Sequence, residues 1–277
     1  MTKSYGANDI QVLEGLDAVR LRPGMYIGTT GARGLHHLLW EIVDNAVDEA
    51  ANGFATTVEV ILHDDCSVTV RDDGRGIPIG MHDTLKIPGV QVVFTQLHAG
   101  GKFNTNNYNY SGGLHGVGAS VVNALSRWLE VEVAIDGQLY RQKYESYEEN
   151  GKMQVGKPVT HLEHVGETEK KGTKIRFLPD DRVFPDIHMN ADVIAKRLKE
   201  LAFLNKGIQL ILIDERKAKG KKDVFHYSGG LKDFVEYLNE DKSVIHPEVI
   251  YFEGEKEGIH AQVAIQYTDS YTESIFS

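Results

Sequence analysis

The chain has 277 residues, enough for one large domain or two smaller ones. Its apolar content of 41% and charged content of 25% are ordinary for a folded soluble protein. The formal net charge of −10 argues against a body that grips nucleic acid on its own, because neutralising phosphates requires clustered Lys and Arg. A single cysteine, Cys66, excludes disulfides within the chain and favours a cytoplasmic location. No apolar run approaches the ~18 residues needed to span a membrane, so we expect no membrane partner.

The first clear helix is predicted at Trp40–Ala50, WEIVDNAVDEA, where apolar residues recur at helical spacing. Glu41, Asn45 and Asp48 fall at i, i+4 and i+7, so they share one stripe of this helix. Most acidic stripes on amphipathic helices are solvated faces without chemistry. The alternative is that these carboxylates and the amide form part of a site.

Residues 57–73 alternate apolar and polar side chains around Asp64-Asp65, which predicts a β-hairpin. The segment Asp72–Pro78, DDGRGIP, follows directly on the second strand. A plain turn is one interpretation, since Asp and Gly are common in turns. A carboxylate at a strand end can also accept a hydrogen bond from an amino group such as that of adenine, which makes Asp72 a candidate ligand.

Residues 98–120 hold six glycines and end at the start of a predicted helix. Successive backbone N–H groups followed by a helix N-terminus can bind an anion, although a flexible loop without function is the alternative. The lysine after Gly101 is followed by Phe103 rather than Ser or Thr, so the loop is not a Walker A motif. The last glycines follow the pattern G-x-x-G-x-G and end at Gly118, which is not the dinucleotide-binding fingerprint.

The remaining predicted elements are a helix at 118–128, two strands within 129–144 joined at Asp136-Gly137, a strand at 172–179, a helix at 190–207, a strand at 208–214, a basic loop at 217–223, a helix at 229–241 and strands at 248–254 and 259–268. Hairpins make neighbouring strands antiparallel, so we expect an α+β fold with helices on one face of a mixed, mostly antiparallel sheet. Residues 1–228 are expected to form one domain. Residues 229–277 are expected to be only the beginning of a second domain, because about fifty residues bury too little apolar surface to fold alone. Residues 271–277 are expected to be a strand in progress, so we expect a truncated chain.

Several long motifs in a fixed order give the chain a specific resemblance. The segments EIVDNAVDEA, DDGRGIP, LHAGGKF, SGGLHGVG and GTKIRF closely resemble the ATPase region of the B subunits of bacterial type IIA topoisomerases, which are DNA gyrase and topoisomerase IV. The wider group is the GHKL ATPases. The resemblance covers essentially the whole chain and implies a GHKL (Bergerat) two-layer sandwich with an N-terminal dimerisation arm, about residues 1–15. The start of a transducer domain (ribosomal S5-like) would follow.

The resemblance implies a role for individual residues. Glu41 matches the general base that polarises the attacking water, and Asn45 matches the Mg²⁺ ligand. Asp72 matches the carboxylate that receives the adenine amino group, with Thr173 supporting it. The further ATP-binding positions that it implies are Tyr5, Gly76, Pro78, Gly101, Lys102, Tyr108, Leu114, His115, Gly116, Val117 and Gly118.

The resemblance also implies ATP and Mg²⁺ as cofactors of an ATP-hydrolysing gyrase B protein, whose ATP-driven dimerisation clamps DNA and powers negative supercoiling by strand passage. The implied partners are a second copy of the same protein, reached by an arm that includes Tyr5 and Ile10, the A subunit of gyrase or topoisomerase IV, and DNA. The B subunit of topoisomerase IV, a decatenating enzyme, stays open as an alternative. A nucleotide-binding switch without significant turnover is an alternative from another class, and the presence of Glu41 argues against it.

Two features depart from the family. The Gln-Thr-Lys segment that supplies a lysine to the γ-phosphate is absent from this sequence. Ile135 stands where many members carry an arginine that contacts aminocoumarin inhibitors, which weakens the expectation that such inhibitors bind. No role follows from the motif for Asp44, Asp48 or Glu49.

Overall fold

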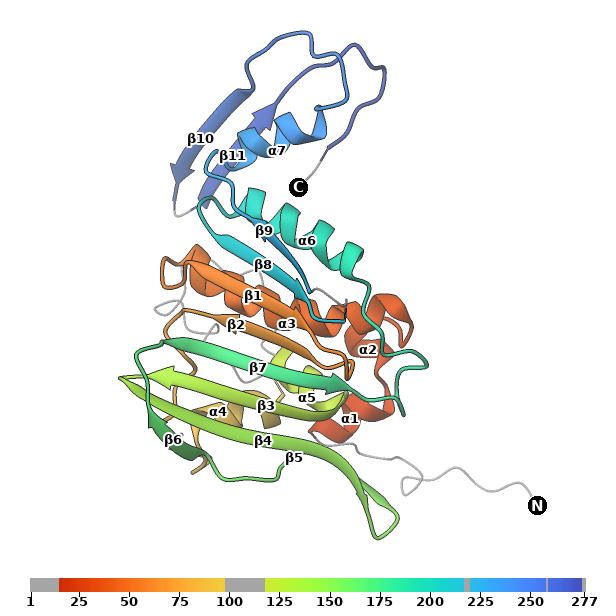
Figure 1. Cartoon of the computed structure of the whole chain (residues 1–277), viewed down its shortest axis with the longest axis vertical. Helices are drawn as coiled ribbons and strands as arrows, with labels where there is room; N and C mark the ends of the chain where they lie inside the picture. The colour runs from red at the N-terminus through yellow and green to blue at the C-terminus, as the bar shows by residue number, and fades with distance from the viewer. Residues whose placement is uncertain (1–14, 98–117, 217–219, 258, 276–277) are drawn as a thin grey trace, which may run out of the picture.

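The computed structural model describes residues 15–97, 118–216, 220–257 and 259–275 (Figure 1). The helices are α1 (Leu16–Leu21), α2 (Gly24–Ile27), α3 (Ala32–Ala51), α4 (Gly89–Thr95), α5 (Gly118–Ala124), α6 (Ala191–Leu204) and α7 (Leu231–Leu238). The strands are β1 (Thr57–Leu62), β2 (Val68–Asp72), β3 (Ser126–Ile135), β4 (Gln138–Glu149), β5 (Lys152–Pro158), β6 (Glu163–Glu167), β7 (Gly172–Pro179), β8 (Gln209–Asp214), β9 (Lys221–Phe225), β10 (Ile250–Lys256) and β11 (Ile259–Ile265). None of the helices in these ranges is long and apolar enough to cross a membrane.

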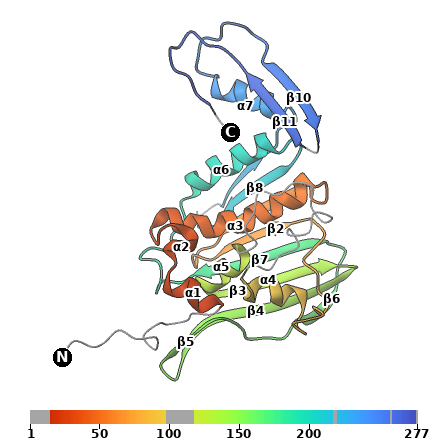
Figure 2. The same cartoon turned by 180° about the vertical axis from the view of Figure 1, so that it is seen from behind.

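Within the described residues, one sheet of nine strands has the order β5-β4-β3-β7-β2-β1-β8-β9, with β6 paired to β4. All of its pairs are antiparallel except β1 with β8. Helices α3, α4 and α5 lie behind the strands in Figure 1 and in front of them in Figure 2, so they cover one face of the sheet. The structure therefore confirms the expected mixed, mostly antiparallel sheet with a helix layer on one face.

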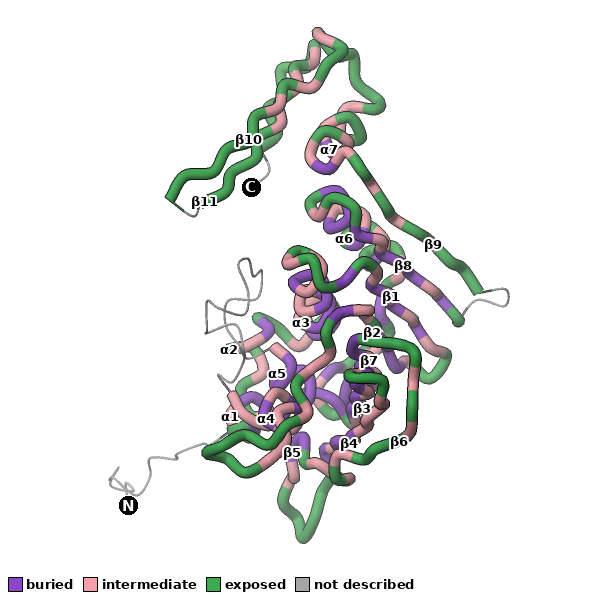
Figure 3. Tube along the Cα trace, turned by 90° about the vertical axis from the view of Figure 1, so that its left-hand side faces the viewer, coloured by how far each residue is buried: buried purple, intermediate pink, exposed green. Residues whose placement is uncertain are grey.

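The core lies between the sheet and this helix layer, where buried residues concentrate (Figure 3). Strand β1 alternates half-buried and buried residues along its length, as a strand with one face on the core must. On the outer face, cross-strand ion pairs join Arg71 to Glu59 at 3.4 Å and Lys174 to Glu132 at 3.0 Å. Exposed pairs of this kind contribute at most ~1 kcal/mol, so burial of the inner face supplies most of the sandwich's stability.

Three expectations from the sequence were wrong. The loop expected at 217–223 is partly strand, because β9 begins at Lys221 and pairs with β8. The helix expected at 118–128 ends at Ala124, and β3 begins at Ser126. Strand pairing with β4 and β7, which buries Leu129 and Val131, overrides the local helical pattern. Residues 271–275 carry no strand, so the expected final strand is not present in its described part.

Helix α7 and the hairpin β10–β11 form a smaller unit, whose two-stranded sheet is separate from the nine-stranded one. This unit packs on α6 through Phe234, whose ring centroid lies 5.3 Å from that of Phe203. The expected division between two domains at residue 228 stays a prediction.

The buried face of the sheet includes a polar residue, Gln142, whose side-chain oxygen and nitrogen both make hydrogen bonds. Gln142 is completely buried, and its Nε2 donates to Gln91 Oε1 at 3.1 Å and to the carbonyl of Thr160 at 3.2 Å. Its Oε1 accepts from the hydroxyl of Tyr144 at 2.8 Å. Burial raises the pKa of Tyr144 well above its usual range, so the phenol stays a donor.

We expect Tyr144→Phe to lower the free energy of unfolding by about 1–3 kcal/mol, because the ring stays in place while Gln142 Oε1 is left buried without a donor. Urea denaturation measures the difference. Tyr147→Phe is the matched control, since Tyr147 lies on the same strand but is 36% exposed, and it should change stability by less than ~0.5 kcal/mol. Equal effects of the two substitutions would contradict the role given to Gln142.

Candidate active site

Helix α3 places Glu41 and Asn45 one turn apart, as the sequence predicted. Both side chains are half-buried, while the opposite face of the helix is buried against the sheet. The apolar positions Leu35, Leu38, Leu39, Ile42, Val43 and Ala46 form that buried face. The polar stripe is thus fixed in direction by the packing of the apolar one.

Among the described residues, His37 and Gly118 lie close to the Glu41 carboxylate. Its Oε1 lies 3.0 Å from Nε2 of His37, one turn earlier on α3. On the other side stands Gly118, the first residue of α5, where an added Cβ would overlap Glu41 Oε2. Only glycine permits this approach, so bare backbone of α5 faces the carboxylate. Sequence reasoning did not single out His37, although its i−4 spacing from Glu41 in HHLLWE was visible.

Asp72 ends β2, and its carboxylate is held from one side. Oδ1 accepts from the amide N of Gly74 at 2.9 Å and from the amide N of Thr173 at 3.3 Å. Within the described part of the chain, Oδ2 accepts no hydrogen bond. Burial raises the pKa of Asp72 to about 6, with a further contribution from the charge of Glu49, and the two amides oppose this shift only in part. Thr173 therefore supports Asp72 through its backbone amide.

Glycines bring the backbone close around Asp72. Gly172 has φ of 109°, and a Cβ there would overlap the carbonyl of Asp72. Gly76 has φ of 81°, and its Cβ would lie 3.0 Å from Val133 Cγ1. Pro78 follows in the same turn and is exposed. Gly76 thus lets the turn after β2 approach β3, and Gly172 lets β7 approach the end of β2.

Glu49, which had no assigned role, ties this turn to α3. It accepts from Arg75 through Nε at 3.1 Å, through Nη2 at 2.8 Å and through the backbone amide at 3.1 Å. The Arg75 guanidinium also lies over the ring of Phe54, 3.5 Å from its centroid. Sequence reasoning missed this pair, because 26 residues separate the partners and no local pattern joins them.

An open pocket of about 500 Å³ lies beside this pair. It is lined by Gly53, Phe54, Gly74, Arg75, Ala134, Ile135, Asp136 and Lys171. Ile135, which stands at the position where many family members carry an arginine, therefore lines this pocket. The effect on inhibitor binding stays a prediction.

The described site runs along one stripe of α3. Glu41, Asn45 and Glu49 are spaced by four residues, so they cover about 12 Å of the helix axis. Gly118 marks one end and the turn after Asp72 the other. The other predicted nucleotide contacts lie outside the described residues: Tyr5, Gly101, Lys102, Tyr108, Leu114, His115, Gly116 and Val117. Among the residues that are described, no group of three or more His, Cys, Asp or Glu side chains could hold a metal ion.

Comparisons with known proteins match the chain to one group of ATPases. Residues 30–183 match the family described as histidine kinase-, DNA gyrase B-, and HSP90-like ATPase, and residues 230–277 match the family described as DNA gyrase B. The B subunit of DNA topoisomerase 4 from Enterococcus faecalis is 52% identical over 278 residues, which is 100% of this chain and 39% of that protein. The B subunit of DNA gyrase from Clostridium acetobutylicum is 53% identical over 274 residues, which is 99% of this chain and 41% of that protein.

Among solved structures, the 43K ATPase domain of Thermus thermophilus gyrase B, crystallised with an aminocoumarin, superposes with a TM-score of 0.79. It is 37% identical, and the match covers 93% of this chain and 63% of that one. The expected fold is therefore confirmed. The chain spans about two fifths of the length of the curated relatives it matches.

The raised pKa of Asp72 predicts a stability effect of definite sign. The folded state binds the Asp72 proton more tightly than the unfolded chain, so stability falls as pH rises from 3.8 to about 6. We expect Asp72→Asn to raise the free energy of unfolding at pH 7.5 by about 1–3 kcal/mol, and to leave it nearly unchanged below pH 3.8.

The neighbouring Asp73 supplies a control of opposite sign. Burial alone would raise its pKa, but hydrogen bonds from Thr56 and Thr57 outweigh burial and lower it. Asp73→Asn should therefore destabilise the protein at pH 7.5. Denaturant titrations of both variants at several pH values decide the matter, and a destabilising Asp72→Asn at pH 7.5 would contradict the assignment.

Proposed function

The chain belongs to the family of histidine kinase-, DNA gyrase B- and HSP90-like ATPases, and on that premise we propose that it binds and hydrolyses ATP as the ATPase part of the B protein of a type IIA topoisomerase. The observation that carries the proposal is the stripe of α3. On this stripe, Glu41 lies against Gly118, the first residue of α5. Glu49 on the same stripe accepts a hydrogen bond from Arg75, in the turn that follows Asp72.

In this proposal Asp72 recognises adenine. Oδ1 is occupied by two backbone amides, which fixes the carboxylate and leaves Oδ2 to accept from the 6-amino group. Above pH of about 6 the group is ionised and is a strong acceptor. Guanine offers a carbonyl oxygen at the same place, so two acceptors would face each other. Gly76 and Pro78 line the adenine pocket.

Glu41 is the proposed general base. Its carboxylate accepts the proton of the water that attacks the γ-phosphate, while His37 restrains its rotation and Gly118 lets the backbone of α5 approach it. Phosphoryl transfer needs little covalent help from a protein beyond positioning and charge stabilisation. Lys102, Tyr108 and residues 114–118 are the proposed phosphate lid, and Tyr5 belongs to the proposed arm.

Asn45 is the proposed Mg²⁺ ligand. Its amide oxygen is a suitable ligand for the ion, and Asn45 lies one turn from Glu41 on α3. Mg²⁺ keeps several waters and takes few protein ligands, so one amide oxygen together with phosphate oxygens would suffice to hold it. When bound, the ion would neutralise charge on the phosphates.

For the whole protein we propose negative supercoiling by a gyrase, with a second copy of the same protein, the A subunit and DNA as partners. Decatenation by a topoisomerase IV is the alternative, since curated relatives of both kinds are about equally identical to this chain. Supercoiling and decatenation assays on the full-length protein with its A partner would separate the two. We place the protein in the cytoplasm, where both reactions take place.

We expect Glu41→Gln to reduce ATP turnover by about 10²–10⁴-fold and to leave ATP affinity within about twofold, because the amide keeps the shape of the side chain but cannot take a proton. Steady-state hydrolysis by the full-length protein and calorimetry measure the two quantities. Glu200→Gln, on the distant helix α6, is the matched control and should retain activity. If Glu41→Gln keeps more than a tenth of wild-type turnover, Glu41 is not the general base. If the wild-type protein itself does not hydrolyse ATP, the alternative of a nucleotide-binding switch without turnover is favoured.

Asp72→Ala should weaken ATP binding by about 10–150-fold, since a hydrogen bond to a charged group contributes roughly 1.5–3 kcal/mol. The wild-type protein should prefer ATP to GTP by a similar factor, and the variant should lose much of this preference. Calorimetric titration of both nucleotides tests the proposal. Equal affinity of the wild-type protein for ATP and GTP would be incompatible with adenine recognition by Asp72.

A further inference from the structure

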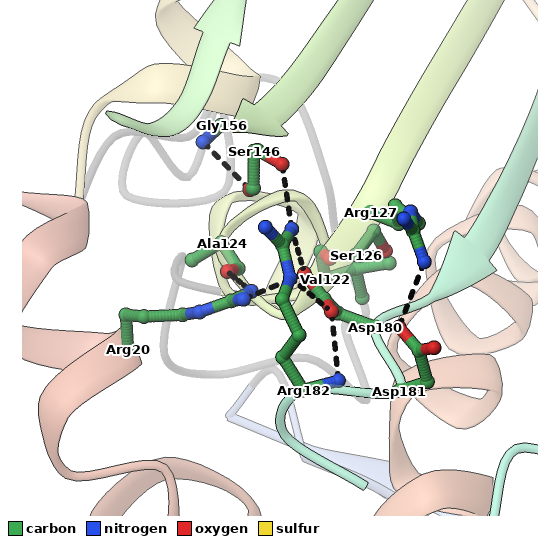
Figure 4. A network of polar contacts seen from close by, with 10 residues as sticks. All are labelled: Arg20, Val122, Ala124, Ser126, Arg127, Ser146, Gly156, Asp180, Asp181 and Arg182. Atoms are coloured by element: carbon green, nitrogen blue, oxygen red, sulfur yellow. Dashed lines mark hydrogen bonds and ion pairs between the residues drawn. The ribbon is translucent and has the colours of Figure 1, made fainter. Parts of the chain in front are cut away.

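Asp180, in the turn after β7, is fully buried and shared by two arginines (Figure 4). Arg182 donates through Nε to Oδ1 at 2.8 Å and through Nη2 to Oδ2 at 2.6 Å, and Arg20 donates through Nη2 to Oδ2 at 2.6 Å. Burial by itself would raise the pKa of Asp180, but the hydrogen bonds from Arg182 and Arg20 outweigh it and lower the pKa to about 2. Arg182 also donates to the carbonyl of Ser146, which fixes it to β4.

The second arm of the Arg20 guanidinium reaches the end of α5. Its Nη1 donates to the carbonyl of Ala124 at 3.2 Å, and Ala124 is the last residue of that helix. The last four carbonyls of a helix lack partners within it, and a positive charge there complements the helix dipole. The amide N of Asp180 donates to the next carbonyl, that of Leu125, at 3.0 Å. Arg20 and Asp180 together therefore close the C-terminal end of α5.

Helix α5 is short and rigidly enclosed. All of its residues after Gly118 are buried, and a helix of seven residues spans only about 10 Å. Asn123 holds its side by donating to the carbonyls of Phe94 and Gly156, both at 2.9 Å. Because α5 is one short helix, a displacement at its C-terminal end should also shift Gly118, whose backbone lies against the Glu41 carboxylate.

We propose that Arg20 is a positioning residue for ATP hydrolysis: by joining the end of α5 to buried Asp180, it sets where the Gly118 backbone stands against Glu41. The inference rests on the proposed function, in which Glu41 is the base. Arg20 comes from α1, so the clamp that it forms between Asp180 and Ala124 makes the geometry of the site depend on an element that does not line it.

The clamp requires the guanidinium fork. One planar group serves two acceptors at once, the Asp180 carboxylate and the Ala124 carbonyl. A lysine keeps the charge but not the fork, so Arg20→Lys separates geometry from charge, and Arg20→Gln removes both. Arg127→Gln is the matched control, because it removes a neighbouring pair with Asp181 at 3.0 Å whose side chains are 53% and 56% exposed (Figure 4).

The first test uses the full-length protein, with steady-state ATP hydrolysis and calorimetric binding of ADP. We expect kcat to fall at least about tenfold in Arg20→Gln and to be restored only in part by Arg20→Lys, since small misplacements of catalytic groups cost large factors in rate. ADP affinity should fall less than kcat, because Asp72 and the turn that follows it lie at the other end of the site from Gly118. A kcat for Arg20→Gln equal to that of Arg127→Gln overturns the inference. So does a loss of ADP affinity in parallel with kcat, which would indicate general unfolding.

The second test does not depend on hydrolysis. Hydrogen exchange of the amides of residues 119–125 should be at least about tenfold faster in Arg20→Lys than in wild type, while Arg127→Gln leaves it unchanged. Arg20→Lys keeps a cation beside Asp180, so it serves here should Arg20→Gln fail to fold. Unchanged exchange of α5 in Arg20→Lys overturns the inference. If wild type does not hydrolyse ATP, the proposed function fails, and the exchange data still decide whether the clamp exists.

Discussion

Burial of the apolar stripe of α3 on the sheet is the constraint from which the rest of the site follows. Because that stripe is packed between β1, β2 and the neighbouring helices, the opposite stripe can point in only one direction. Glu41, Asn45 and Glu49 therefore stand in a row. The sequence supports this arrangement at low cost, since the helix is stabilised by its core contacts and can tolerate a run of like charges on its other side.

The half-buried carboxylate of Asp72 costs the fold some stability. A carboxylate that is partly withdrawn from water and lies near Glu49 is disfavoured in its ionised form, and its pKa is raised accordingly. Two amides compensate only in part, and both serve the same oxygen. Such a group lowers the stability of the protein, and in the proposed function its second oxygen accepts a hydrogen bond from the ligand; perturbed carboxylates of this kind are common at functional sites.

Helices, hairpins and turns that depend on residues close together in the sequence were predictable. Contacts between residues far apart in the sequence were not. The Glu41–Asn45 spacing on α3, the hairpin β1–β2 and the Asp136-Gly137 turn between β3 and β4 each follow from spacing within a few residues. Asp48, which was expected on the same stripe as Glu41 and Asn45, is instead buried. The start of β3 at Ser126 was missed because strand pairing with β7 decides it. The Glu49–Arg75 and Arg20–Asp180 pairs join residues 26 and 160 positions apart, and no local pattern distinguishes their members from other surface charges.

The position of Arg20 relative to the family match suggests how the clamp relates to the shared fold. Residues 30–183, which match the ATPase family, contain Glu41, Asp72, Gly118 and Asp180. Arg20 lies on α1, before that stretch, and reaches into it at the one place where α5 ends. The family-matched sandwich thus contains the site and the buried carboxylate of Asp180. The preceding segment contains Arg20, which joins that carboxylate to the end of α5. Because the same guanidinium satisfies Asp180 and caps α5, a change in the position of α1 acts on both ends of this connection at once.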